Sequence, residues 1–119
     1  MSADGGPPRE LPDGFAPEHL VLAGLVRCTL ASLLYHARRA SVAVLAAEGD
    51  ASGSVTRREA DGRYAFVEID CRLAVELDPL PEGEELGALL AKAERDCFVG
   101  ASLTAQLRYS WHVNGGEVA

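Results

Sequence analysis

Two of the three cysteines lie inside apolar stretches with helical periodicity. Cys28 belongs to the run from Pro17 to about Arg39, and Cys97 to the run that starts near Glu82. A thiolate is a nucleophile, and two thiols that lie close together can cycle between a dithiol and a disulfide. Bridging two cysteines requires their Cα atoms to lie within about 7 Å of each other. The chemistry therefore depends on whether the two predicted helices cross at these residues.

The sequence neighbours of the two thiols differ in charge. Cys97 follows Glu94 and Asp96, two acids that raise the pKa expected for its thiol. Cys28 follows Arg27, which points about 100° away on a helix, and it lies too deep in its helix to benefit from the helix dipole. Of the two, Cys28 is the better candidate for the nucleophile and Cys97 for the resolving partner.

The third cysteine, Cys71, lies on the apolar side of an alternating pattern and is interpreted as a small core residue. A single cysteine in an apolar helix is also packing more often than chemistry. A scaffold in which all the thiols only fill space therefore stays an alternative. What favours chemistry is the joint placement of Cys28 and Cys97, because each lies in one of only two long predicted helices.

No other set of residues predicts a catalytic or metal site. The histidines are dispersed, at His19, His36 and His112, and the sequence has no CxxC or HxxxH spacing of the kind found in metal sites. No glycine-rich phosphate loop follows a predicted strand. We therefore expect neither a cofactor nor a metal.

The composition is that of a soluble globular protein of one domain. The chain has 119 residues, 48% of them hydrophobic, and a formal net charge of −7. An acidic chain is a poor ligand for nucleic acid or an anionic membrane, because both attract basic surfaces. The longest nearly uncharged run, Leu20 to Leu34, is shorter than a membrane span, and residues 1–11 lack the pattern of a secretory signal. We expect a cytoplasmic protein with reduced thiols.

Hydrophobic periodicity divides the chain into helices and strands. Residues 1–14 and 115–119 are interpreted as flexible tails around one domain, 15–114. The Asp61-Gly62 pair predicts a hairpin turn between two strands. The expected elements are a helix over 17–39, a kinked strand over 41–58, a strand over 64–77, a helix from 82 to about 100 and a strand over 104–113. This order predicts an α+β fold, with two central helices packed on an antiparallel sheet.

The first predicted helix is apolar on nearly every side, so other elements must enclose it. The strand over 64–77 alternates between apolar and charged residues, which gives the sheet one buried face. Three strands are few for this task. A second copy of the chain is the natural source of the missing cover, and we expect a homodimer.

Two motifs resemble those of a known family. The segment Pro17-Glu18-His19-Leu20, with Cys28 ten positions after Glu18, resembles the PE-L…C helix of the OsmC/Ohr family, the osmotically inducible and organic hydroperoxide resistance proteins. The segment from Ala93 to Cys97 is similar to the second signature of that family, A-x-x-x-C. The likeness covers roughly residues 16–113.

The resemblance implies an OsmC-like dimer that reduces organic hydroperoxides. The thiolate of Cys28 attacks the peroxide and becomes a sulfenic acid, and Cys97 condenses with it to a disulfide. A dithiol such as a lipoyl group is the implied reductant. Glu18 matches the family glutamate that orients an arginine over the reactive sulfur.

The sequence departs from the family pattern at two places. The only arginine before Glu18 is Arg9, whose surroundings do not match the family motif, and Phe98 replaces the family proline after the second cysteine. Along a continuous helix, Glu18 and Cys28 are also separated by about 15 Å. These departures favour an alternative function, a non-catalytic OsmC-like dimeric module that binds a small apolar ligand or a protein.

Overall fold

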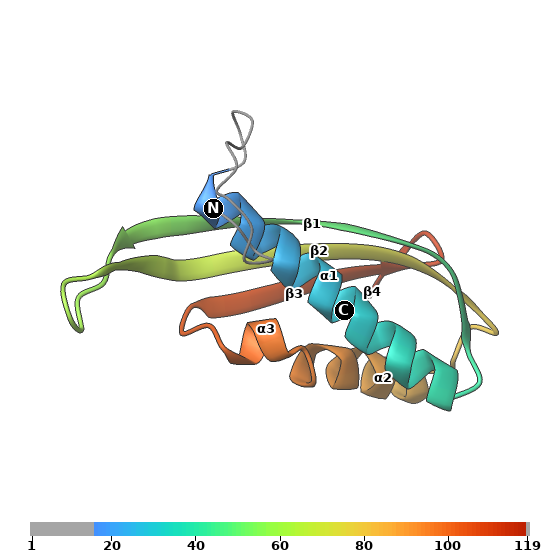
Figure 1. Ribbon diagram of the computed structural model, residues 1–119. Helices are drawn as coiled ribbons and strands as arrows, with labels where there is room; N and C mark the ends of the chain where they lie inside the picture. The colour runs from blue at the N-terminus through green and yellow to red at the C-terminus, as the bar shows by residue number, and fades with distance from the viewer. Residues whose placement is uncertain (1–15, 119) are drawn as a thin grey trace, which may run out of the picture.

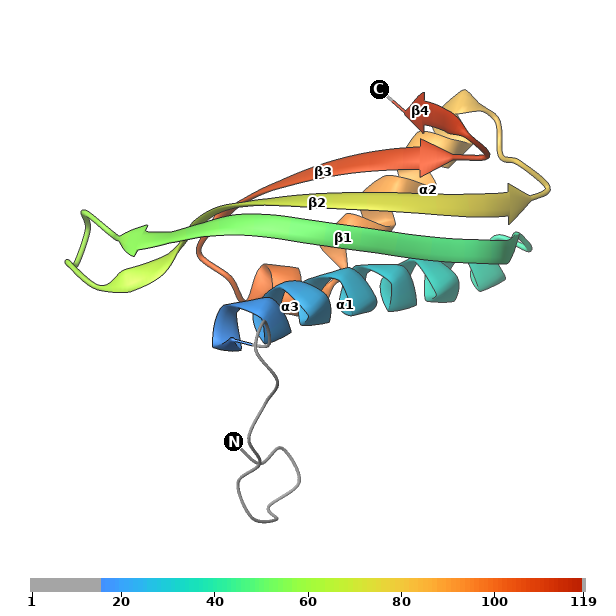
Figure 2. The same ribbon diagram turned by 90° about the horizontal axis from the view of Figure 1, so that it is seen from above.

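The computed structural model describes residues 16–118, which form a sheet with helices on one side of it. The elements are α1 (Pro17–Arg39), β1 (Ala43–Arg57), β2 (Tyr64–Asp78), α2 (Gly83–Arg95), α3 (Phe98–Ala101), β3 (Gln106–Val113) and β4 (Gly116–Val118). Figures 1 and 2 show α2 beneath β2 and β3, while α1 runs beside β1. The expected α+β architecture is confirmed.

The sheet has the strand order β1-β2-β3-β4 and is mixed, not antiparallel as the sequence led us to expect. β1 pairs with β2 antiparallel and β3 with β4 antiparallel, but β2 and β3 run parallel. The reason is the connection: α2 and α3 carry the chain back under the sheet, so β3 starts at the same end as β2. A helical crossover of this kind joins parallel strands.

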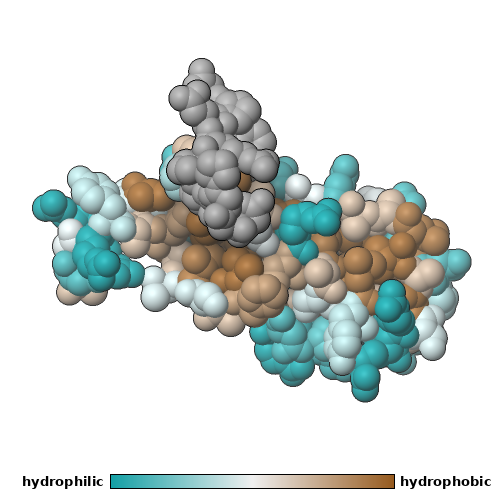
Figure 3. All heavy atoms as spheres, in the orientation of Figure 1, coloured by the Kyte–Doolittle hydropathy of each residue, from teal (hydrophilic) through white to brown (hydrophobic). Residues whose placement is uncertain are grey.

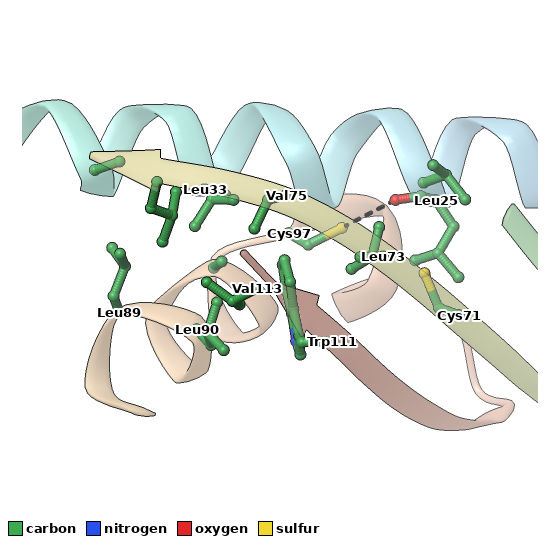
Figure 4. Packing of buried hydrophobic residues seen from close by; sticks show 14 of the residues in the cluster. Leu25, Leu33, Cys71, Leu73, Val75, Leu89, Leu90, Cys97, Trp111 and Val113 are labelled. Carbon is green, nitrogen blue, oxygen red and sulfur yellow. Dashed lines mark hydrogen bonds between the residues drawn. The ribbon is translucent and has the colours of Figure 1, made fainter. Parts of the chain in front are cut away.

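The core lies between the inward face of β2 and the helices. The predicted alternation of β2 is confirmed, and its inward side chains pack against α1, α2 and β3 (Figure 4). Trp111 of β3 is 4% exposed, and its indole N–H donates to Glu94 Oε2 at 3.0 Å, which satisfies the polar atom of the largest core side chain. The buried β2 residues are Ile69, Cys71, Leu73, Val75 and Leu77.

Helix α1 is the central helix of the core, although only one stripe of it is buried. That stripe consists of Leu25, Val26, Thr29, Leu33 and Ala37. With 23 residues and a mean hydropathy of 1.6, α1 is long and apolar enough to cross a membrane, contrary to the expectation from the shorter run. A core helix of a globular protein passes the same test, and α1 contacts α2, α3, β1 and β2.

A considerable apolar surface stays uncovered in the single chain. Leu34 and Tyr35 of α1 are 48% and 59% exposed, and Leu45 of β1 is 64% exposed. Figure 3 shows hydrophobic residues gathered on the side of the molecule where α1 lies. Nearly all of β1 is exposed. The described part of the chain thus leaves the helix without the all-round cover that its sequence demands.

Two boundaries differ from those expected. The second predicted helix does not continue to Gly100, because α2 ends at Arg95 and the extended residue Cys97 begins α3. The segment expected to be a C-terminal tail contains β4, which follows a turn at Asn114 and Gly115. Both turn residues have positive φ angles, 52° and 82°. An Asn-Gly pair is a strong hairpin signal that the sequence analysis did not use.

Substitution by alanine is expected to have opposite effects at Gly49, where β1 lies close to β2, and at Gly87, which faces open space on α2. A Cβ at Gly49 would lie 2.7 Å from Leu73 Cδ2 and 2.9 Å from the carbonyl oxygen of Arg72, whereas a Cβ at Gly87 in α2 meets nothing within 4 Å. We expect Gly49→Ala to lower the free energy of unfolding by about 1–3 kcal/mol through overpacking. Gly87→Ala should raise it by about 0.5–1 kcal/mol. Urea denaturation measures both, and an unchanged Gly49→Ala protein would contradict the close approach.

Candidate functional site

The sulfur of Cys97 lies in the core, at the interruption of helical structure between α2 and α3. The residue is 0% exposed. Its Sγ accepts hydrogen bonds from the hydroxyl of Thr29 at 3.3 Å and from the backbone N–H of Gly100 at 3.4 Å. Figure 4 shows its contact with the carbonyl oxygen of Leu25, at 3.9 Å. The break in the helix therefore turns this thiol toward the inward face of α1.

Burial and hydrogen bonding act on the Cys97 thiol in opposite directions. Burial is the largest effect and raises its pKa, while the hydrogen bonds from Thr29 and Gly100 lower it. The thiol of Cys28 adds to the rise of this pKa. The net result is a raised pKa, so Cys97 keeps its proton at neutral pH. Thr29, the residue after Cys28, contacts the Cys97 sulfur at 3.3 Å, so the fold brings the two segments that carry these cysteines together.

Cys28 differs from Cys97 because it is half-buried and faces a hollow. It lines a space of about 430 Å³ together with Ala31, Ser32, Tyr35, His36, Asp96 and Phe98. Phe98 is 74% exposed and Tyr35 59%, so two aromatic rings flank the opening. A small molecule that enters the hollow reaches Cys28, whereas Cys97 is shielded. This geometry suits an attacking thiol at Cys28 and a second thiol behind it.

The lining of the same hollow includes a hydrogen-bonded histidine and aspartate, His36 and Asp96, which the sequence did not indicate as a pair. His36 Nε2 lies 2.7 Å from Asp96 Oδ2, which ties the last turn of α1 to the residue after α2. Arg95 binds the same carboxylate, and Arg95 and His36 together hold the pKa of Asp96 at about 2. The sequence does not reveal this pair, because the two residues are 60 positions apart.

Glu18, the third predicted site residue, is not brought to the thiols within this chain. It is exposed in the first turn of α1. Because α1 is unbroken, Glu18 and Cys28 are separated by about 15 Å along its axis. Arg9 lies outside the described residues. Among the residues described as lining the hollow, His36 and Asp96 are the charged or basic groups, and none is an arginine.

The remaining thiol, Cys71, is a buried core residue, as the sequence indicated. It is 0% exposed, and burial is the main cause that raises its pKa to about 11. All three cysteines are free thiols. Within residues 16–118, no group of three or more His, Cys, Asp and Glu side chains is arranged to hold a metal ion.

Comparison with known proteins shows the family to which this sequence belongs. The sequence matches the family model described as OsmC-like protein over residues 10–112. The chain belongs to the OsmC-like family. A search of curated protein sequences gave no match. The match includes both segments that carry Cys28 and Cys97, and it confirms the resemblance that their motifs indicated.

Solved structures of the family share the fold at low sequence identity. An OsmC-like protein of unknown function from Vibrio cholerae aligns with a TM-score of 0.72 at 20% identity, over 80% of this chain and 62% of that protein. An OsmC-like protein from Mycoplasma pneumoniae gives 0.71 at 19% identity, over 87% and 77% of the two chains. An organic hydroperoxide resistance protein from Elizabethkingia anophelis gives 0.63 at 20% identity, over 87% and 76%. The chain thus spans less than two thirds of the first of these relatives.

The raised pKa of Cys71 predicts a loss of stability in alkali. In the unfolded chain this thiol ionises near its ordinary value of 9.0, but in the fold it stays protonated up to about 11. Its contribution is complete below pH 9 and is lost as the pH rises toward 11. Between pH 9 and 11, we expect the free energy of unfolding to fall in both proteins, but by on the order of 2 kcal/mol less in Cys71→Ala than in the wild type.

Urea denaturation at a series of pH values measures the difference. Burial also raises the pKa of Tyr109, to about 12, so the wild type alone shows a mixed effect and the comparison with Cys71→Ala is needed. Parallel pH profiles of the two proteins would show that Cys71 is not the titrating group.

Proposed function

We propose that this chain is a thiol peroxidase that reduces organic hydroperoxides through a dithiol–disulfide cycle of Cys28 and Cys97. One observation carries the proposal. Cys28 faces an apolar hollow, and Cys97 is buried against Thr29, the residue that follows Cys28 on α1. Several structural relatives are named organic hydroperoxide resistance proteins.

The two thiols take different steps because their exposure differs. The thiolate of Cys28 attacks the terminal peroxide oxygen of ROOH, the O–O bond breaks, and the alcohol ROH leaves after taking up a proton. Cys28 is then a sulfenic acid. The Cys97 sulfur attacks the Cys28 sulfur, water is released and the disulfide forms. The raised pKa of Cys97 keeps it protonated until that second step.

The hollow defines the class of substrate and the path of the reductant. The aromatic side chains of Tyr35 and Phe98 offer apolar surface for the organic group of a hydroperoxide. Cys28 is the sulfur that a dithiol reductant meets first, since Cys97 is 0% exposed. Reduction therefore begins with attack on Cys28. The net charge of −7 argues against nucleic acid or an anionic membrane as partner, and we place the reaction in the cytoplasm.

A homodimer completes the proposal. The exposed Leu34, Tyr35 and Leu45 need cover, and a second copy supplies it. Because Glu18 lies about 15 Å along α1 from the Cys28 of its own chain, it acts on the thiol only through a second copy or through residues before 16. We therefore assign Glu18 a supporting role at most.

A second candidate function rests on a different hollow. A space of about 700 Å³ lies between the end of α1, the segment from Pro79 to Glu82, and α2. Its lining includes Val42, Leu80 and Leu89, and its size is within the range of small-molecule sites. A non-catalytic module that binds a small apolar ligand would use this space. It would leave hydroperoxides unreduced.

Single-cysteine variants test the peroxidase against this rival. With cumene hydroperoxide and dithiothreitol, we expect the wild type and Cys71→Ala to consume the peroxide at similar rates, because Cys71 lies outside the hollow. Cys28→Ser should fall to the background rate, since it lacks the attacking sulfur. In Cys97→Ser, the sulfenic acid at Cys28 has no resolving thiol and should be trapped by dimedone, as mass spectrometry would show.

The outcome that contradicts the peroxidase is equal decay in all four proteins. The rival then gains support if an apolar fluorescent probe binds the wild type but not the Leu80→Glu variant, because Leu80 lines the larger hollow.

A further inference from the structure

Thr29 is a buried polar residue of the core, and its hydroxyl lies within hydrogen-bond distance of two acceptors. It is 0% exposed, whereas the other buried core residues within 16–118 are apolar or cysteine. Its hydroxyl oxygen lies 2.8 Å from the carbonyl oxygen of Leu25 and 3.3 Å from the sulfur of Cys97. Thr29 follows Cys28 on α1, but it faces inward. It is thus in contact with the second sulfur of the pair.

The Thr29 hydroxyl has one proton and two acceptors. When Cys97 is a neutral thiol, the carbonyl of Leu25 is the better acceptor, and the short contact is the usual bond of a helical threonine to the preceding turn. When the sulfur carries a negative charge, a hydrogen bond to it is charge-assisted and stronger. The hydroxyl can turn from one acceptor to the other by rotation about its C–O bond.

The second donor is fixed. The backbone N–H of Gly100 points at the same sulfur from 3.4 Å. A Cβ at Gly100 would lie 3.0 Å from Tyr109 Oη and 3.2 Å from Leu107 Cδ1, so α3 packs tightly against β3 at this residue. That packing holds the amide in place. The Cys97 sulfur therefore lies between one rotating and one rigid hydrogen-bond donor.

We propose that Thr29 and the Gly100 amide form a receptor for the negative charge on the Cys97 sulfur, and that Thr29 is a further catalytic residue in the reductive half of the cycle. The inference rests on the proposed function for the role of the disulfide. A thiolate of the dithiol reductant attacks Cys28 Sγ, and the Cys28–Cys97 bond breaks. Its electron pair passes to Cys97 Sγ, which leaves as a thiolate and is later protonated.

The first step leaves a mixed disulfide between Cys28 and the reductant. The second thiol of the reductant then attacks the reductant sulfur in this mixed disulfide, which releases the Cys28 thiolate and the reductant as a cyclic disulfide. The step that needs help is the first, because the leaving sulfur is fully buried and burial opposes its charge. Hydrogen-bond donors that already lie at the sulfur lower the cost of its negative charge, because the protein does not have to rearrange during the step.

The experiment compares Thr29→Val with Thr29→Ser. Valine keeps the shape of threonine but removes the donor, while serine keeps the donor. In a Cys28→Ser, Cys71→Ala background, Cys97 is the single cysteine of a chain that has three. Its titration is followed by NMR of ¹³C-labelled cysteine, which does not require access to solvent. We expect Thr29→Val to raise the Cys97 pKa above that of the background protein, and Thr29→Ser to leave it near the background value.

The second measurement uses the three-cysteine chain. The Cys28–Cys97 disulfide is formed with diamide, and its reduction by dithiothreitol is followed. We expect reduction to be slowed about tenfold in Thr29→Val, the size expected for one hydrogen bond to a charged group, and to stay near wild type in Thr29→Ser. Thr29→Ala replaces the valine variant should that protein fail to fold, and circular dichroism decides this.

The outcomes separate this inference from the peroxidase itself. A Cys97 titration that is the same in Thr29→Val, Thr29→Ser and the background overturns the role of Thr29, whether or not the chain reduces peroxides. A raised pKa in Thr29→Val alone supports the receptor, even if hydroperoxide decays at the background rate. In that case only the proposed function fails.

Discussion

The interruption of the helix after α2 fixes the position of α1, because two adjacent residues there, Asp96 and Cys97, contact the same side of α1 at points about two turns apart. Cys97 turns inward and meets Thr29, while Asp96 turns outward and binds His36 at 2.7 Å. Thr29 and His36 are separated by seven positions, or about two turns of helix. A continuous α2 would direct successive side chains about 100° apart around one axis and would lose this double contact. The relative placement of the two thiols depends on it.

The same break explains the division of labour between the thiols. Cys97 is removed from water, which destabilises its thiolate, but two hydrogen-bond donors at the sulfur offset part of this cost. Cys28 lies one residue before Thr29 on α1, which places it partly outside the core and at the hollow. One turn of helix thus offers a buried hydroxyl to one sulfur and an accessible sulfur to solvent. The asymmetry follows from packing.

The sheet and α1 are less complete than the core around the thiols. The described chain spans 62% of the Vibrio cholerae relative and 77% of the Mycoplasma pneumoniae relative. β1 is exposed along most of its length, and the outer side of α1 bears Leu34 and Tyr35. Apolar surface of this kind costs free energy in water until something covers it. A second copy that covers it would also lie close to the aromatic rim of the hollow, which includes Tyr35.

Much of the fold was predictable because it depends on local patterns. The alternation of β2, the turn at Gly62 with its φ of 70°, and both long helices follow from periods of two and 3.6 residues and from the properties of glycine. The errors arose where a connection or a turn decides. The crossover through α2 makes β2 and β3 parallel, and the Asn114-Gly115 turn adds β4.

The sequence by itself determined that Cys28 lies in a long apolar helix and that Cys97 comes at the end of a second helical segment, because residue type and periodicity are local properties. Only the tertiary structure decided which groups surround them. Thr29 reaches Cys97 across 68 positions and His36 reaches Asp96 across 60. The separation of Glu18 from Cys28, in contrast, follows from a single continuous helix and was a local property of the sequence. Contacts between distant segments depend on how the helices cross and where one of them ends, and no local pattern specifies either.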